Sequence, residues 1–454
     1  MINQHNDIRH IHFVGIGGAG MSGLAEVLHY QGYQVSGSDL LVTSVTDRLN
    51  ALGITVYQGH SAEHIKNADF LVVTSAVTSN NVEVLAARNK KIPVLKRAEM
   101  LAELMRMKRG IAIAGTSGKT TTTSLLAAIM HAAKLDPTYI IGGKVNSIGA
   151  NAKLGSSEFL LAEADESDAS FLYLSPEIAV ITNINPDHLY NYQQNFSRLK
   201  QAFHDFLNRL PINGLAILCA DDKNVVEQVS AINRACLTYG FSEKVDFRAV
   251  HVKMTQSNTT FAVKRNGKPD LHVELNMLGR HNVLNALAAI AVADYLKIED
   301  QCIVKGLSGF LGVDRRLNIC GEKVIAGKKA LLIDDYGHHP KELLAAINTL
   351  REVWPNRSIT MVFQPHRFTR TRDLFDELVD VLTAVDRLIL LPIYPACESP
   401  IEGISSQTLC QAVKQGEVVS PSDLLAVLKH TLHDDDILLM QGAGDIGLLV
   451  EQFI

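Results

Sequence analysis

Residues 110–123 read GIAIAGTSGKTTTT, an apolar run that ends in glycine, lysine and four threonines. This order predicts a phosphate-binding loop between a buried strand and a helix, although Ile113 stands where the usual loop has its first glycine. In such a loop Lys119 meets the β- and γ-phosphates, and the hydroxyl of Thr120 binds Mg²⁺. Threonine is a poor helix former, so the four threonines indicate selection for oxygen ligands. The alternative, a tight turn that binds nothing, does not explain the lysine or the hydroxyl residues.

The composition is that of a globular protein. The chain has 454 residues, of which 47% are hydrophobic and 20% charged, and about 150 residues per domain predicts three domains. The net charge of −5, without a basic block, argues against a nucleic-acid surface. Six cysteines without C-x-x-C spacing indicate reduced thiols. With a polar N-terminus and no apolar run of about 20 residues, we expect no membrane association and a cytoplasmic protein.

Short β-branched runs alternate with amphipathic stretches over residues 10–97, a pattern that predicts a parallel sheet of the Rossmann type. The middle of the chain has helical patterns at 97–107 and 281–296, with buried strand runs between them. Past Arg316 the alternation resumes. We therefore expect an α/β protein of three domains: a Rossmann-like domain over 1–98, a central P-loop ATPase-like domain with a mostly parallel sheet over 99–313, and a Rossmann-like, doubly wound domain over 314–454.

A second glycine-rich stretch, GIGGAG, occupies residues 15–20 and fits G-x-G-x-x-G. It follows a predicted strand and precedes a helix, so its backbone can approach a pyrophosphate at the helix N-terminus. Asp39 ends the next strand, where a ribose-binding acid is expected. The pattern suits NAD as well as another diphosphate, and a turn without a ligand is the remaining alternative. Together with the loop at 115–121, it predicts two diphosphate ligands.

Two polar clusters follow buried strands in the central segment. AEADESD (162–168) places four carboxylates within seven residues, and beside a nucleotide loop a hard cation is a better explanation than a solvated acidic loop. TNINPDH (182–188) ends in His188, which is a candidate for a second metal ligand, although a surface or capping histidine is the common alternative.

Two more clusters lie in the C-terminal third. DDYGHHP (334–340) stands at a strand end, where ligand sites collect in open α/β sheets. QPHRFTRTRD (364–373) presents Arg367, Arg370 and Arg372, which suit bidentate recognition of a carboxylate or phosphate. A solvated charged loop is the alternative for the arginines.

Taken together, these motifs resemble those of the Mur ligase family over nearly the whole chain. That family's nucleotide loop also lacks the first glycine, as GTSGKTTT does here. The other motifs stand in the family's order: GIGGAGMSGLAE, AEADESDASF, NPDH, GRHNVLNA, DDYGHHP and HRFTRT. The resemblance implies an ATP-dependent ligase of peptidoglycan precursor synthesis, and it is strongest to the member that joins L-alanine to the lactyl carboxylate of UDP-N-acetylmuramate through an acyl phosphate.

The resemblance also assigns roles to matching positions. The UDP-sugar would be held by Gly17, Gly18, Ala19, Gly20, Met21, Ser22, Asp39 and Ser75. ATP would be held by Gly115, Thr116, Ser117, Gly118, Lys119, Thr120, Thr121, Asn282, Asn285 and Arg316. One Mg²⁺ would be held by Thr120 and Glu163, and a second by His188. The catalytic residues would be Lys119, Glu163, His188, Asp335, His338, Arg367 and Arg370, the last four of which would position L-alanine and the muramoyl end.

Ser117 and Tyr190 depart from residues that are common in the family, histidine and aspartate respectively. We expect a monomer or a weak homodimer. Three other functions are alternatives. One is the recycling ligase of the same family, which attaches an intact tripeptide to the same UDP-sugar. Another is an NAD-dependent dehydrogenase with an accessory ATPase domain, which would leave the NPDH, HHP and HRFTR motifs without a role. The third is a regulatory or scaffold ATPase that binds the UDP-sugar without turnover.

Overall fold

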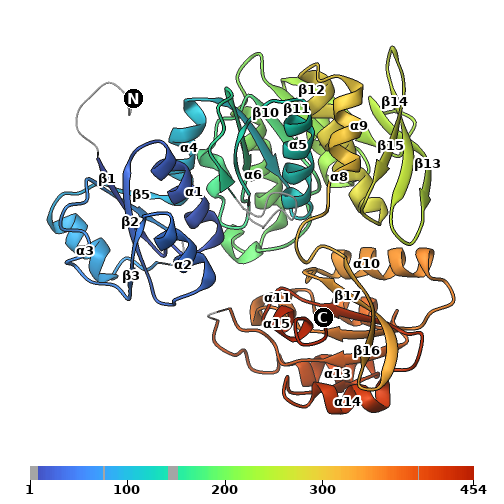
Figure 1. Cartoon of the computed structure of the whole chain (residues 1–454). Helices are drawn as coiled ribbons and strands as arrows, with labels where there is room; N and C mark the ends of the chain where they lie inside the picture. The colour runs from blue at the N-terminus through green and yellow to red at the C-terminus, as the bar shows by residue number, and fades with distance from the viewer. Residues whose placement is uncertain (1–8, 75–76, 142–151, 397) are drawn as a thin grey trace. The chain divides into compact units, whose positions relative to one another are not determined.

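The structure, a computed structural model, describes residues 9–74, 77–141, 152–396 and 398–454. It contains three mostly parallel sheets with helices between the strands, which confirms the predicted three-domain α/β fold (Figure 1). The chain groups into two compact units. The first holds Met1–Val250, Val263–Leu271 and Leu284–Phe310, and the second holds His251–Ala262, His272–Val283 and Leu311–Ile454. The domain boundaries at 98/99 and 313/314 stay predictions.

The N-terminal sheet has the strand order β3-β2-β1-β4-β5, and all its strands are parallel. The strands are β1 (His10–Val14), β2 (Gln34–Asp39), β3 (Thr55–Gln58), β4 (Phe70–Val73) and β5 (Val94–Lys96). The helices are α1 (Ala19–Tyr30), α2 (Ser44–Ala51) and α3 (Val82–Asn89). The order runs outward from β1 in both directions, so the carboxyl ends of β1 and β4 form a topological switch point. The GIGGAG loop leaves β1 at this point.

The central sheet has the order β15-β14-β13-β12-β11-β10-β6-β9-β7-β8. Its strands are β6 (Arg109–Ala114), β7 (Thr138–Ile140), β8 (Ala152–Lys153), β9 (Phe159–Glu163), β10 (Ile178–Ile181), β11 (Leu215–Cys219), β12 (Ala235–Gly240), β13 (Phe247–Met254), β14 (Thr259–Arg265) and β15 (Lys268–Leu275). β6 lies between β9 and β10 and is parallel to both. The loop after β6 is therefore flanked by the segments that follow its two neighbours, which carry the AEADESD and TNINPDH motifs.

The helical segments of this part are α4 (Arg97–Arg106), α5 (Lys119–Ala132), η1 (Ser170–Tyr173), η2 (Leu189–Tyr192), α6 (Phe196–Asn208), α7 (Lys223–Val229), α8 (Arg280–Tyr295) and α9 (Asp300–Ser308). α4 corresponds to the helix predicted over 97–107. Its buried Met100 and Leu104 belong to one continuous apolar cluster with Phe13 beneath the N-terminal sheet and Phe203 beneath the central one. Because this core is shared, the first two sheets form a single compact unit.

The C-terminal sheet has the order β16-β17-β21-β18-β19-β20, with β16 antiparallel at its edge. Its strands are β16 (Asn318–Ile325), β17 (Lys328–Asp335), β18 (Ile359–Phe363), β19 (Arg387–Leu390), β20 (Glu417–Val418) and β21 (Ile437–Gln441). Its helices are α10 (Pro340–Val353), α11 (Phe368–Asp373), α12 (Phe375–Leu382), α13 (Ser406–Val413), α14 (Leu424–Thr431) and α15 (Ile446–Val450). β21 follows the other strands in sequence but lies in the middle of the sheet.

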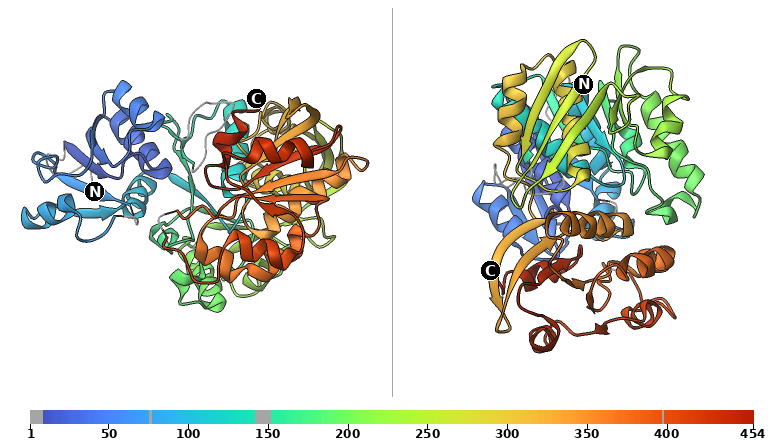
Figure 2. Two further views of the ribbon diagram at one scale, coloured as in Figure 1. Left: turned by 90° about the horizontal axis from the view of Figure 1, so that it is seen from below. Right: turned by 90° about the vertical axis from the view of Figure 1, so that its right-hand side faces the viewer.

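Alternate residues of β17 enter separate apolar clusters on the two faces of this sheet. Leu331 and Ile333 pack on one face, and Leu332 packs on the other. Helices cover both faces (Figure 2), as a doubly wound sheet requires. Within the parts of the chain that the structure describes, every helix is too short or too polar to span a lipid bilayer.

Candidate functional site

The loop between β6 and α5 has glycine where no other residue fits. Gly115 has φ of 135°, and a Cβ atom there would lie 2.0 Å from Oγ1 of Thr182. Gly118 has φ of 86°, and its Cβ would lie 2.4 Å from Oδ1 of Asn285. Both backbone conformations lie in the region that favours glycine. The loop is thus built around two glycines, although Ile113 replaces the first glycine of the usual motif.

The segment after β10 holds this loop through backbone groups. The amide of Ser117 donates to Oδ1 of Asn183 (3.0 Å), and the Ser117 carbonyl accepts from Nδ2 of Asn183 (2.9 Å) and Oγ1 of Thr182 (2.6 Å). The backbone of Ser117 therefore anchors the loop, and these contacts do not depend on the side chain at this position. His188 was the predicted site residue of this segment, because nothing local marks Thr182 or Asn183 as residues that support the loop.

The four threonines differ in their surroundings. Thr121, Thr122 and Thr123 are buried in the first turns of α5. The hydroxyl of Thr123 donates to the carbonyl of Lys119 (2.9 Å), and that of Thr122 donates to Oδ1 of Asn285 (3.3 Å). Only Thr120 is partly exposed. The expectation that the whole run supplies oxygen ligands is therefore wrong for Thr122 and Thr123, whose hydroxyls satisfy the protein's own groups.

Lys119 is surrounded by oxygen atoms. Its Nζ lies 2.6 Å from the carbonyl oxygen of Gly115, 3.4 Å from that of Thr116 and 2.6 Å from Oε2 of Glu166. Burial opposes the charge of Lys119, but the carboxylates of Glu166 and Asp165 outweigh it and raise the pKa of the lysine. The side chain is thus a cation at neutral pH.

Glu166 is the most buried carboxylate of the AEADESD motif, with 3% of its surface exposed. Burial raises its pKa to about 7, although Lys119 opposes this shift. Nothing in the AEADESD motif distinguishes this residue, because its contact with Lys119 joins segments 47 positions apart. Glu163, the predicted site residue of this motif, is the last residue of β9 and is partly exposed.

One cavity of about 310 Å³ brings the two glycine loops together. Its lining includes Gly18, Gly20 and Met21 from the first loop and Lys119, Glu163 and Asp165 from the second site. Arg97, at the start of α4, also lines it, with Nη2 3.6 Å from Oδ2 of Asp165. This arginine was not expected as a site residue. Residues predicted to bind two separate diphosphates therefore line one space.

The first loop is shaped by Asp39. The amide of Gly17 donates to Oδ2 of Asp39 (2.8 Å), and a Cβ atom on Gly17 would lie 2.9 Å from the same oxygen. Ser22 is fully buried within α1, away from the cavity lining, whereas Ala19 is the first residue of that helix. Ser75 lies outside the described residues.

His188 immediately precedes η2 with φ of 53°, and its Nε2 lies 3.5 Å from Oδ2 of Asp187. Asp187 thus places a carboxylate beside the imidazole, and the side chain of Tyr190 is exposed. Among the described residues, no three His, Cys, Asp or Glu side chains form a metal-binding group. Thr120 and Glu163 are hard oxygen donors, and Mg²⁺ usually takes one or two such groups from the protein and the rest from phosphates and water. These donors therefore fit a cation that arrives with a nucleotide.

In the second unit, Asp335 has both carboxylate oxygens engaged. Oδ2 accepts from the amide of Leu317 (2.7 Å), and Oδ1 accepts from the amide of Gly337 (2.8 Å) and from Nε2 of Gln441 (2.6 Å). β21, which carries Gln441, lies between β17 and β18, so the DDYGHHP and QPHRFTR motifs leave neighbouring parts of one sheet edge. Asp335 organises this edge of the sheet.

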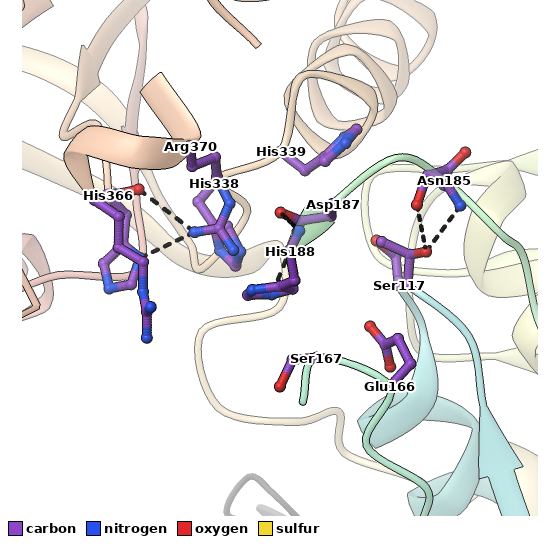
Figure 3. Close-up of polar contacts among 12 residues, drawn as sticks. Ser117, Glu166, Ser167, Asn185, Asp187, His188, His338, His339, His366 and Arg370 are labelled. Carbon is purple, nitrogen blue, oxygen red and sulfur yellow. Dashed lines mark hydrogen bonds and ion pairs between the residues drawn. The ribbon is translucent and has the colours of Figure 1, made fainter. Parts of the chain in front are cut away.

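His338, His366 and Arg370 lie together at this edge (Figure 3). Nη1 of Arg370 is 3.0 Å from Nδ1 of His366, and the rings of His338 and His366 have centroids 5.6 Å apart. Nδ1 of His338 is 3.2 Å from the carbonyl oxygen of Tyr336. His366 was quoted within a motif but not chosen as a site residue. The chain turn between His366 and Arg370, four residues apart, brings the two side chains into contact.

The remaining predicted residues have local partners. Nη1 of Arg367 lies 3.5 Å from Oε1 of Glu398, and the guanidinium of Arg316 lies 5.0 Å from the centroid of the Tyr336 ring. Asn282 donates from Nδ2 to the carbonyl oxygen of Leu278 (2.8 Å) and is buried. Asn285, in α8, lies against Gly118, which immediately precedes α5.

Three domain models of the Mur ligase family match successive segments of the chain. Residues 10–109 match the Mur ligase family catalytic domain, 113–293 the Mur ligase middle domain, and 315–444 the Mur ligase glutamate ligase domain.

Solved structures agree with this result. A UDP-N-acetylmuramate–alanine ligase from Thermotoga maritima is 30% identical, with 98% of each chain covered and a TM-score of 0.82. A murein peptide ligase from Psychrobacter arcticus is 22% identical over 98% of each chain (TM-score 0.72), which shows the fold. A UDP-N-acetylmuramate:L-alanyl-γ-D-glutamyl-meso-diaminopimelate ligase from Neisseria meningitides is 29% identical over 68% of this chain and 100% of its own (TM-score 0.62). This protein therefore belongs to the Mur ligase family, the ATP-dependent ligases of peptidoglycan precursor synthesis.

Proposed function

We propose that this Mur ligase joins L-alanine to the lactyl carboxylate of UDP-N-acetylmuramate. The observation that carries the proposal is the shared cavity, in which Gly18 and Gly20 face the same space as Lys119 and Glu163. A UDP-sugar held at the first loop would present its acid end to ATP held at the second. The Thermotoga maritima relative, whose name states this substrate and this amino acid, adds support.

The proposed chemistry has two steps. The lactyl carboxylate attacks the γ-phosphate in line, which forms an acyl phosphate and releases ADP. The free amine of L-alanine then attacks the acyl carbon, and the tetrahedral intermediate expels phosphate. Activation is needed because a carboxylate oxygen is a very poor leaving group. Since acyl phosphates hydrolyse readily, the reaction requires a site that excludes water.

The loop between β6 and α5 and the nearby oxygen donors would bind ATP and Mg²⁺. The amides of the loop between Gly115 and Thr121 would hold the phosphates, and Lys119 would offset the charge between the two anions. Thr120 and Glu163 would hold Mg²⁺, with His188 on a second ion, and bound Mg²⁺ supplies further charge stabilisation on the phosphates.

Residues of the C-terminal third would bind and orient the amino acid. Arg370 would pair with the carboxylate of alanine, with Arg367 beside it, and Asp335 or His338 would orient or deprotonate the amine. In this proposal residues 1–98 bind the UDP-sugar, 99–313 bind ATP and 314–454 bind the amino acid.

The test is phosphate release with UDP-N-acetylmuramate, ATP and a panel of L-alanine, L-serine, glycine and the tripeptide L-alanyl-γ-D-glutamyl-meso-diaminopimelate. We expect release with L-alanine, and none without the UDP-sugar. Release with the UDP-sugar and the tripeptide, but with none of the three amino acids, would replace the proposal by the recycling ligase. The NAD-dependent dehydrogenase has no support from the family matches, and an absorbance change with NADH would be needed to restore it.

A variant tests the assigned phosphate-binding group. Lys119→Ala is expected to abolish phosphate release while UDP-N-acetylmuramate still binds, because the lysine lies at the nucleotide loop. Retained turnover would remove Lys119 from the mechanism.

A further inference from the structure

We propose that Glu166 is a positioning residue that holds Lys119 while no nucleotide is bound and competes with the nucleotide phosphates for it. This inference rests on the proposed function in one respect: it takes Lys119 as the group that binds phosphate. Glu166 has no place in the reaction steps given above. Its carboxylate is nevertheless the closest anion to that lysine, at 2.6 Å.

The hydrogen-bond donors of Lys119 are all occupied in this structure. A lysine ammonium has three N–H donors. In this structure the carbonyl oxygens of Gly115 and Thr116 and the carboxylate of Glu166 supply three acceptors within hydrogen-bond distance. Every donor of Lys119 thus has a partner inside the protein, so a phosphate can be bound only if one of these contacts is given up.

Of the three contacts of Lys119, the one with Glu166 is the one that a phosphate replaces. Gly115 and Thr116 belong to the phosphate loop itself, so their carbonyls stay beside the lysine when the loop binds a ligand. Glu166 belongs to the segment after β9 and contributes a negative charge. A phosphate oxygen also carries negative charge, so replacing the carboxylate by the phosphate keeps the ammonium paired. Replacing the Glu166 contact by a phosphate contact therefore costs less electrostatic energy than replacing either carbonyl contact.

The backbone around Glu166 is held in place by contacts separate from Lys119. Its carbonyl oxygen accepts a hydrogen bond from the hydroxyl of Tyr192, and the next carbonyl, of Ser167, accepts from Nδ2 of Asn191 (2.6 Å). Both donors lie on η2, and Figure 3 shows Glu166 and Ser167 on their loop. Because the backbone is fixed, the carboxylate stays near the loop after the lysine has turned to a phosphate. At a pH above the pKa of Glu166, where ADP binding is to be compared, like charges then face each other, which weakens nucleotide binding and speeds ADP release.

The experiment measures binding of ADP by isothermal titration calorimetry, with Mg²⁺ and separately with EDTA. Glu166→Gln keeps the shape of the side chain and removes its charge, and we expect ADP to bind about tenfold tighter in both conditions, the change that about 1.4 kcal/mol produces. Glu166→Asp keeps the charge and should remain within about twofold to threefold of the unmodified protein. In turnover, Glu166→Gln should lower both the KM for ATP and kcat, since ADP leaves more slowly.

The matched control is Asp168→Asn, which removes one charge from the same loop. Asp168 accepts a hydrogen bond from the amide of Ser170 and has no contact with Lys119 among those described, so ADP affinity should not change. If Glu166→Gln fails to fold, Tyr192→Phe keeps both charges and frees the backbone of Glu166, and ADP should then bind at least about twofold tighter.

Unchanged or weaker ADP binding in Glu166→Gln, with the control unaltered, would overturn the proposal. Weaker binding only with Mg²⁺ would instead make Glu166 a metal ligand. Failure of the proposed ligase function is a separate result, because it appears as absent phosphate release from the unmodified protein with every amino acid tested.

Discussion

Gly118→Ala is the most direct perturbation of the phosphate loop. Gly118 has φ of 86° at the N-terminus of α5, and a Cβ atom there would lie 2.4 Å from Oδ1 of Asn285. Asn285 is buried and accepts a hydrogen bond from the hydroxyl of Thr122 at 3.3 Å, so it cannot move away without losing a contact. The substitution therefore introduces backbone strain and a steric clash together.

Gly32→Ala separates the two contributions. Gly32 lies just after α1 with φ of 93°, and a Cβ atom there would have nothing within 4 Å. A left-handed conformation costs an L-residue about 1–2 kcal/mol, which is the whole effect expected at Gly32. Overpacking adds about 1–3 kcal/mol at Gly118, so the total there is about 2–5 kcal/mol. Both glycines lie in the first compact unit, which makes the comparison direct.

The assay is unfolding in urea followed by far-UV circular dichroism. Fluorescence of Trp354, the single tryptophan, provides an internal reference, because it is buried in the core of the second unit and should report an unchanged transition. We expect Gly118→Ala also to lose nucleotide binding, since the displaced loop no longer directs its amides to the phosphates, whereas Gly32→Ala keeps it. Equal destabilisation by the two substitutions would refute the clash with Asn285.

Two further predictions concern other parts of the chain. Burial acts to raise the pKa of Glu83, but the nearby imidazole of His12 (3.7 Å) and hydrogen bonds with Ser38 and His64 outweigh it and lower the pKa to about 2. Stability from this carboxylate is therefore complete above its ordinary pKa of about 4.5 and is lost as the pH falls towards 2, and Glu83→Gln should cost about 1.5–3 kcal/mol at pH 7 with a flatter acid limb in pH-dependent melting. Arg370→Lys should raise the KM for L-alanine at least about tenfold with nucleotide affinity unchanged, because lysine lacks the planar fork; an unaltered KM would remove Arg370 from the amino-acid site.

The sheets could be predicted because their signals are local. The buried run of β6, the glycines after β1 and the alanine-rich pattern of α8 each lie within one element, and strand–helix alternation is typical of parallel sheets. The sharing of one core by α4 between two sheets could not be predicted. It depends on how Met100 and Leu104 meet residues about a hundred positions away, and no local pattern carries that information.

The same distinction applies to the candidate site. Lys119 and Glu163 could be chosen from motifs, and the cavity brings them together with the first glycine loop. Glu166, Asn183 and Arg97 were missed because their partners lie 47, 66 and 68 positions away. For the run of threonines, the prediction from low helix propensity was wrong at two positions. Thr122 and Thr123 are buried, and their hydroxyls donate to Asn285 and to the carbonyl of Lys119.

The position of β21 in the middle of the C-terminal sheet bears on how this part of the protein is made. While a ribosome is still producing the chain, β17 and β18 are available long before Ile437–Gln441, the strand that joins them on either side. Until that strand emerges, each half exposes an unpaired edge. A nascent chain is therefore open to premature association at this stage, and a stop codon just before Ile437 removes the centre of the sheet, with both of its neighbours left unjoined.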